Sequence, residues 1–411
     1  MIPRPDLVPD EHDSKFEVYQ LTNEADVPAS HIYMEAQIFF PGSERFVLHR
    51  SAHPHGSDPD DPEHQYLLCD LGNDGELTPL TEEVGPTAPA VSPDGEYFYY
   101  FVDDTDIGGG ALTLKRLTLD GWDRETLHVL DGPIPNTSFR FSRPYPLSTI
   151  SSDGQRIAIS GFLGDGDTAN APWGLLVYDL QELEPRLVLH GQTWCNVHPQ
   201  YCRSRDPTER RDLMVQENHG CEYDKRGRVT KLTGGDGADI HVIRDDGSDF
   251  RTMPWGRDGH ESCQGHQCWR GRSNSAITST LKGDEPLAEL IEGRPVDGAG
   301  HQGKQSGDGW RNNLTREMED PDFHHFATDI AGTRMITDRG PQNRDGTIML
   351  FDLPDEEGGT LKNGSVIAQP RSSWEKESHL HPFLSPDGRY GFFNSDESGT
   401  LQAYLVHGWA G

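Results

Sequence analysis

The 411-residue chain has few positive charges and no long apolar run. Lys and Arg number 36 against 68 Asp and Glu, which gives a formal net charge of −32, and eight of the 36 are Lys. This balance excludes a basic face that binds nucleic acid or anionic lipid. Because no run of about 18 apolar residues occurs, we also expect no transmembrane helix and no membrane partner.

Cysteine is scarce as well. Six cysteines in a chain of this length do not make a disulfide scaffold. The first residues have neither a basic leader nor an apolar core, so we expect no signal peptide and a cytoplasmic location. Glycine and proline, by contrast, are common at 45 and 29 residues, while hydrophobic residues make up 33%. This composition favours many short strands joined by turns over packed helices.

A unit of strand, Ser-Pro-Asp-Gly-like turn, aromatic strand and third strand recurs along the chain. The clearest turns are Ser92–Gly95, Ser151–Gly154 and Ser385–Gly388. With weaker copies, the turn centres lie near residues 42, 94, 153, 206, 272, 332 and 387, which are 52 to 66 residues apart. Repeats of this length built from strands and turns are typical of a β-propeller.

The repeats predict an all-β fold: a single seven-bladed β-propeller domain that spans residues 1–411. The last unit lacks one strand, and the early segment Phe16–Leu21 lies outside the first unit. We therefore expect the N-terminal segment to supply that strand and to close the ring. The polar, glycine-rich stretch at about 283–322 is expected to be a long loop over one face.

Four of the nineteen histidines occupy nearly the same position in successive units. His198, His266, His325 and His381 each precede the centre of their turn by seven or eight residues. The first strand of each propeller blade lines the central channel, so we expect these imidazoles to converge at one mouth of it. His379 should lie on the same side as His381 because one residue separates them.

Two interpretations of these histidines remain open: polar residues around a wet channel, or a metal site. A His-x-His pair with one His from the next unit offers three nitrogen ligands and open positions, as in catalytic sites. Oxygen ligands could come from Glu377, Glu375 or a substrate. Cysteine pairs near these histidines (Cys195 with Cys202, and Cys263 with Cys268) allow a second, zinc-type site, although buried free thiols are favoured.

Around these residues the sequence resembles the oligogalacturonate lyases, polysaccharide lyase family 22, over most of its length. The segments that carry the resemblance, in chain order, are Leu80–Gly85, Gln192–Tyr201, Glu261–Trp269, His325–Thr333 and His379–Pro382. Members of that family are seven-bladed propellers that cleave short pectic uronides by β-elimination and use a divalent metal, usually manganese. The resemblance therefore implies a polysaccharide lyase involved in pectin degradation and carbohydrate metabolism.

The resemblance also implies roles for individual residues. His266 would be the general base, Arg203 would bind substrate, and His325, His379 and His381 would bind the metal. Manganese is the cofactor that the family implies, with zinc, iron and nickel as alternatives. The family has a glutamine ligand where this chain has Lys376, and a protonated Lys cannot coordinate a metal. Either Glu377 replaces that ligand, the site is shifted, or the metal is absent.

β-Elimination at a uronate removes the C5 proton beside the carboxylate and expels the C4 oxygen. A cation or Arg on the carboxylate stabilises the enolate-like transition state, and a histidine is a suitable base near neutral pH. His198 and Tyr201 are expected to contact the substrate. Tyr201 could instead protonate the leaving oxygen, or it could be a packed aromatic residue of the channel.

Three functions therefore compete. The first is a metal-assisted lyase for a small acidic, oligogalacturonate-like oligosaccharide. The second is a propeller hydrolase or eliminase for another sugar acid with the same metal site. The third is a non-catalytic propeller that binds a carbohydrate or a protein, since a fold alone does not imply activity. The sequence leaves the exact sugar, the mode of cleavage and the oligomeric state open.

Overall fold

The computed structural model describes residues 1–9, 15–51, 61, 63–233, 237–256, 261–282, 288–297, 309–342, 345–375 and 378–409. Within these ranges the regular structure is β-strand apart from three short 3-10 helices, η1 Pro5–Leu7, η2 Leu71–Asn73 and η3 Glu209–Arg211. The all-β prediction is therefore confirmed. No helix among the described residues is long and apolar enough to cross a membrane.

Antiparallel four-stranded sheets are the main unit of the fold, and four of them follow the chain strand by strand. The first contains β3 Ala29–His31, β4 Arg45–Arg50, β5 Gln65–Asp70 and β6 Glu76–Pro79. The second contains β7 Pro86–Val91, β8 Tyr97–Asp106, β9 Gly109–Thr118 and β10 Asp123–Leu130. The third contains β11 Ser142–Ile150, β12 Arg156–Phe162, β13 Trp173–Asp179 and β14 Pro185–Gly191. The fourth contains β26 Phe323–Thr328, β27 Arg334–Gln342, β28 Asp345–Asp352 and β29 Lys362–Ala368.

The region between the third and fourth of these sheets forms one nine-stranded sheet. Its strands are β15 Gln200–Tyr201, β16 Asp212–Asn218, β19 Ala238–Arg244, β20 Arg251–Thr252, β21 Glu261–Trp269, β22 Ala276–Lys282, β23 Ala288–Gly293, β24 Val296–Asp297 and β25 Arg311–Asn313. Ala238 of β19 pairs with Cys263 of β21 and joins its two halves. A separate hairpin is formed by β17 Glu222–Tyr223 and β18 Val229–Lys231.

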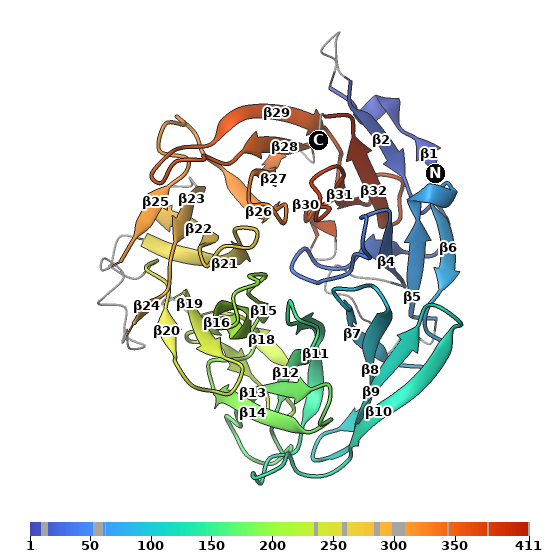
Figure 1. Ribbon diagram of the computed structural model, residues 1–411, viewed down its shortest axis with the longest axis vertical. Coiled ribbons are helices and arrows are strands. Elements are labelled where there is room, and N and C mark those ends of the chain that lie inside the picture. Colours follow the sequence, from blue (N-terminus) through green and yellow to red (C-terminus); the bar gives the residue numbers. More distant parts are fainter. Residues whose placement is uncertain are drawn as a thin grey trace.

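The sheets stand around a common centre, as in a β-propeller (Figure 1). In each four-stranded sheet the first strand lies nearest the centre and the fourth lies at the periphery, as for β7 and β10 or β26 and β29. This arrangement brings the ends of strands from distant parts of the sequence together at the middle of the molecule.

Part of the expected loop at 283–322 belongs to a sheet instead. β23 pairs with β22 over six residues, and Leu290 and Ile291 are fully or almost fully buried. β25 adds to the outer edge of β23. The prediction of an irregular stretch is therefore wrong for Ala288–Gly293, because this short strand is buried on both faces and has no alternation of apolar and polar residues that would mark it in the sequence.

The two ends of the chain share one sheet, in the order β1 Ile2–Pro3, β2 Glu17–Gln20, β32 Gln402–His407, β31 Gly391–Ser395 and β30 Phe383–Leu384. β2 pairs antiparallel with β32, from Glu17 opposite His407 to Gln20 opposite Tyr404. The N and C labels in Figure 1 lie on neighbouring parts of the ring.

The Ser-Pro-Asp-Gly turns have the geometry that their sequence predicts. In the turn between β7 and β8, the Ser92 carbonyl accepts a hydrogen bond from the Gly95 N–H at 2.8 Å, and the Ser92 hydroxyl donates to Asp94 at 2.5 Å. Gly95 has a φ of +75°, a left-handed conformation that glycine adopts without strain. The equivalent glycines, Gly154 and Gly388, have φ of +70° and +69°.

Candidate active site

A cavity of about 1020 Å³ lies at the centre of the ring and is lined by five histidines. They are the four that the sequence places in register, His198, His266, His325 and His381, together with the expected neighbour His379. His266 lies in β21 and His325 in β26, both innermost strands, while His381 lies two residues before β30. The predicted convergence of these side chains is therefore observed.

The backbone at two of these histidines is held in an unusual conformation. His198 has a φ of +45° and His381 a φ of +43°, and each directly precedes a proline. A left-handed conformation at a non-glycine residue costs on the order of 1–3 kcal/mol and persists only where the surrounding structure enforces it. Such residues concentrate at functional sites, which marks both positions as candidates.

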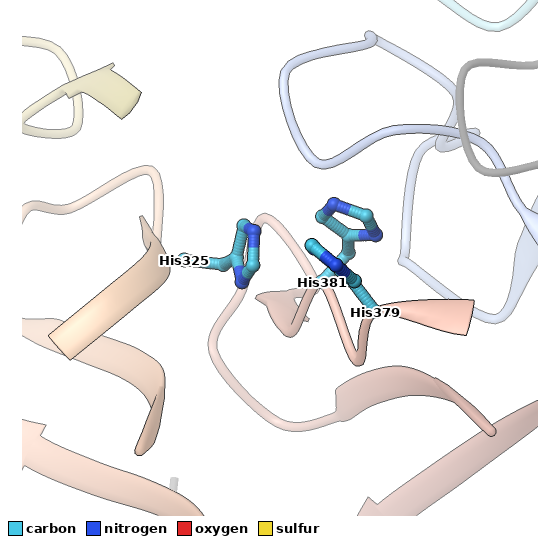
Figure 2. Close-up of side chains that lie close together, drawn as sticks. All are labelled: His325, His379 and His381. Atoms are coloured by element: carbon cyan, nitrogen blue, oxygen red, sulfur yellow. The ribbon is translucent and has the colours of Figure 1, made fainter. Parts of the chain in front are cut away.

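His325, His379 and His381 form a compact group (Figure 2). One nitrogen of each imidazole lies within 4.8 Å of the others. The ring centroid of His325 is 4.3 Å from that of His381 and 5.4 Å from that of His379. Figure 2 shows His325 approaching from one sheet and the His379–His381 pair from the next, so that the rings meet in the space between them.

A buried carboxylate fixes the orientation of His325. Asp338 on the neighbouring strand β27 is fully buried and accepts two hydrogen bonds, from the His325 backbone N–H at 2.9 Å and from its Nδ1 at 2.7 Å. Burial raises the pKa of Asp338, but the electrostatic interaction with His325 and these two hydrogen bonds outweigh burial and hold the pKa below its usual range. With Nδ1 protonated, Nε2 presents its lone pair to the other imidazoles.

His266 lies beside this group, with its ring centroid 4.6 Å from that of His325. Burial, followed by the repulsion from nearby histidines, lowers the pKa of His266 well below its usual value. Its Nδ1 has no hydrogen-bond partner among the described residues. The side chain is therefore a neutral imidazole that faces the cavity, which is the state a proton acceptor needs.

His198 belongs to a hydrogen-bonded group that the sequence did not predict. Its Nδ1 lies 3.0 Å from the Glu35 carboxylate, and its Nε2 lies 3.0 Å from the Tyr145 hydroxyl. Burial raises the pKa of Glu35, while the adjacent His198 opposes that shift. The Tyr33 ring contacts His198 at 5.3 Å and His381 at 4.9 Å between centroids, and so connects this group to the three histidines.

Positive side chains line part of the cavity, in spite of the acidic composition. The lining contains Arg143, Arg226, Arg228 and Lys231. The last three come from the hairpin β17–β18 and its turn, and acidic residues from Asp103 to Asp106 lie on the same cavity wall. These cations offer an anionic ligand a local attraction that the net charge of the chain does not provide.

Two expected substrate residues lie elsewhere. Tyr201 is 1% exposed and packs in a hydrophobic cluster with Leu213 and Val215. This position matches the alternative of a packed aromatic residue, and a substrate contact of Tyr201 stays a prediction. Arg203 is partly buried near Cys202 and Cys268, and burial lowers its pKa. Neither Tyr201 nor Arg203 is among the described residues that line the cavity.

The remaining expectations concern an oxygen ligand and the cysteines. Glu377, like Lys376, lies outside the described residues. All six cysteines are free, and a hydrogen bond with the thiol of Cys221, rather than of Cys202, raises the pKa of Cys195. The groups of potential metal ligands among the described residues contain no cysteine, so the zinc-type cysteine site is not supported.

Comparison with known proteins was made on sequence and on structure. No family model and no curated protein matches the sequence. Among solved structures, an oligogalacturonate lyase in complex with manganese is 18% identical, with a TM-score of 0.70 and coverage of 99% of this chain and 96% of that chain. The chain has the fold of the oligogalacturonate lyases.

Two further solved structures are similar in fold to this chain. An oligogalacturonate lyase from Vibrio parahaemolyticus is 15% identical, with a TM-score of 0.69 and coverage of 99% of this chain and 97% of that chain. A prolyl endopeptidase matches less well, at 12% identity and a TM-score of 0.54, with coverage of 94% of this chain and 50% of that chain. At these sequence identities the structural comparison establishes the fold. The reaction has to be inferred from the residues of the candidate site.

Proposed function

We propose that the protein is a metal-assisted lyase that cleaves small acidic, uronic-acid oligosaccharides by β-elimination. The observation that carries this proposal is the cavity itself. It places a neutral, buried imidazole, His266, 4.6 Å from the ring of His325 in a group of three histidines. Positive side chains such as Arg228 and Lys231 line the same cavity and suit an anionic substrate.

The three histidines fit a divalent cation. Their nitrogens lie within 4.8 Å of one another, and the hydrogen bond from His325 to Asp338 is the outer-shell contact typical of metal-binding histidines. Burial and the neighbouring His325 lower the pKa of His379, which keeps it in the neutral form that coordinates metals. When bound, the cation would supply charge withdrawal from the substrate carboxylate. Manganese is our first choice, with zinc, iron and nickel as alternatives.

In the proposed reaction His266 accepts the C5 proton of the uronate. The electron pair of the C5–H bond forms the C4–C5 double bond, the C4–O bond breaks, and the departing oxygen takes up a proton from solvent water. Burial makes His266 a neutral acceptor before substrate binds. His198, held between Glu35 and Tyr145, would contact the sugar through its ring face in the cavity wall, because both of its ring nitrogens are engaged by these partners.

We further infer that the chain is a single domain of seven blades, the last completed by the N-terminal strand. The pairing of β2 with β32 and the two halves of the nine-stranded sheet support this count. We also propose a cytoplasmic location, and the six free thiols support a reducing compartment.

The reaction type is tested by digestion of a panel of uronic-acid oligosaccharides, with parallel measurement of ultraviolet absorbance and reducing ends. Elimination produces a conjugated, unsaturated uronide, so both signals should rise together and should fall on addition of a chelator. New reducing ends without the absorbance would show a hydrolase. If every substrate of the panel is unchanged while binding is still measured, the protein is a non-catalytic carbohydrate-binding propeller.

A further inference from the structure

A second group of buried ligand-type side chains lies in the strand pair β16–β19, apart from the cavity histidines. We propose that Glu217, Asp239 and His241 bind a second divalent cation of the zinc class, with His219 in contact with both carboxylates. Each of the three residues offers one ligand atom, and these atoms lie within 4.8 Å of one another. The group goes beyond the proposed reaction and does not depend on it.

The register of the two strands brings these side chains to one face. Glu217 and Asp239 are direct partners across the antiparallel pair, and His241 lies two residues beyond Asp239. Side chains two residues apart on a strand share a face, and directly opposite residues do as well. The register of the sheet therefore makes the two carboxylates and the imidazole neighbours.

The distances between the polar atoms suit a shared cation. His241 Nε2 lies 3.1 Å from Glu217 Oε2, while His219 Nε2 lies 3.1 Å from Asp239 Oδ2 and 3.5 Å from Glu217 Oε2. Ligands at about 2.0–2.1 Å around a tetrahedral zinc ion are separated by about 3.3 Å. The group could accept such an ion with small side-chain movements.

The buried negative charges of this group also favour a bound cation. Glu217 is 4% and Asp239 5% exposed, and His241 is fully buried. Two carboxylates that face each other away from water repel unless positive charge lies between them. A divalent cation would neutralise both carboxylates and leave His241 neutral. The alternative is that both histidines are protonated, and the experiment below separates the two cases.

The surroundings resemble the outer shell of a metal site. His241 Nδ1 lies 2.9 Å from the Thr252 hydroxyl, which leaves Nε2 directed at Glu217. The Thr193 hydroxyl donates to the other oxygen of Glu217. The His241 ring packs on Phe250, with centroids 4.8 Å apart. Partners that orient ligand side chains in this way accompany most histidine and carboxylate ligands.

The position suggests a structural cation in the wall of the cavity. Gln216, which precedes Glu217 and points to the other face of the sheet, lines the cavity. Ala238, which precedes Asp239, pairs with Cys263 in the strand that carries His266. A cation on this face would therefore fix the strands that present the catalytic side chains, without contact with the substrate.

Metal content of the dialysed, zinc-loaded protein tests the proposal by elemental analysis. We expect Asp239→Asn and His241→Gln each to lose one equivalent of zinc relative to the parent protein. His325→Ala should keep that equivalent, and the exposed control Glu222→Gln should lose none. If the cavity histidines bind no metal, the parent holds a single equivalent that Asp239→Asn still removes, so the two proposals fail separately.

If Asp239→Asn and His241→Gln fold poorly, thermal unfolding of a different variant provides an independent test. In the His325→Ala variant, added zinc should raise the unfolding temperature, because binding to the folded state stabilises it. Zinc content unchanged by Asp239→Asn and His241→Gln would overturn the proposal. An unfolding temperature of His325→Ala that does not respond to zinc would overturn it as well and would favour protonated histidines.

Discussion

Asp338 illustrates how a single buried residue determines the chemistry of its neighbour. It holds His325 by two hydrogen bonds and directs the free nitrogen toward His379 and His381. The sequence predicted His325 but not Asp338. The reason is a bulge between Phe323 and Phe326 in the pairing of β26 with β27, which shifts the register by an amount that the sequence does not show.

We expect Asp338→Asn to weaken metal binding about 10- to 100-fold, the usual effect of losing an outer-shell partner. The amide can still hydrogen-bond but no longer carries the charge that supports the imidazole. Calorimetric titration with Mn²⁺ measures the change. Asp320→Asn, at an exposed carboxylate paired with Arg339, is the matched control and should bind Mn²⁺ normally. Equal affinity in both variants would contradict this role of Asp338.

His266→Ala tests the proton acceptor. Because a general base contributes about 10²- to 10⁴-fold, kcat for unsaturated product should fall by that factor while Mn²⁺ binding persists. His407→Ala, in β32, changes a histidine that stacks on Tyr19 outside the cavity and should leave kcat unchanged. If His266→Ala retains full kcat, the base is another residue.

Other side-chain contacts of the site were also not predicted from the sequence. Glu35 and His198 are 163 positions apart, and Glu35 lies in the connection 32–44 between β3 and β4, which has no recognisable motif. Tyr201 was expected at the substrate because it follows His198 in a family-like segment, but it packs against Leu213 in the core. Motif order can indicate which segment reaches a site, whereas the face that each side chain occupies depends on the tertiary packing.

At the scale of strands and turns the sequence was more informative. The turns marked by Gly95, Gly154 and Gly388 occur where the repeats place them, because only a few residue types tolerate their left-handed backbone. The register of the histidines relative to those turns also predicted their convergence. The strand Ala288–Gly293 was missed, since a six-residue strand inside a glycine-rich region carries too weak a pattern.

Aromatic packing between sheets connects the two ends of the chain. Phe392 of β31 is fully buried, with its ring centroid 4.8 Å from Phe46 of β4 and 5.1 Å from Phe383 of β30. All three rings belong to one hydrophobic core cluster, which also includes Val18 of β2. The first and last sheets are therefore held together by side-chain packing as well as by the pairing of β2 with β32.

Phe392→Ala should reduce the free energy of unfolding by about 3–5 kcal/mol, because it removes a buried ring and leaves a cavity between the sheets. Urea denaturation followed by circular dichroism measures the change. Val129→Ala, at a residue 47% exposed on the outer strand β10, is the control and should change it by less than about 0.5 kcal/mol. A loss for Phe392→Ala as small as the control would mean that this contact does not stabilise the ring.

For the whole molecule the net charge of −32 is the dominant feature. Like charges spread over one compact surface repel and oppose folding. The same field would repel the proposed anionic substrate at long range, so its recognition would depend on the local cations of the cavity, Arg143, Arg226, Arg228 and Lys231. This contrast explains how so acidic a protein could bind an acidic sugar.

We expect sodium chloride to raise the unfolding temperature. Between about 0.01 M and about 1 M salt the Debye length falls from about 30 Å to about 3 Å, which screens the repulsion between surface carboxylates. Chloride is preferred to sulfate because sulfate strengthens apolar burial by itself. Scanning calorimetry at both salt concentrations measures the effect, and an unfolding temperature that falls with salt would show that attractive ion pairs outweigh the repulsion.

The central claim is that His325, His379 and His381 bind a divalent cation beside the base His266. The most direct test is an anomalous difference map from crystals grown with Mn²⁺. We expect a strong peak between these three imidazoles, on the side of the cavity that His266 faces. A map without density there, or with density only among Glu217, Asp239 and His241, would contradict it.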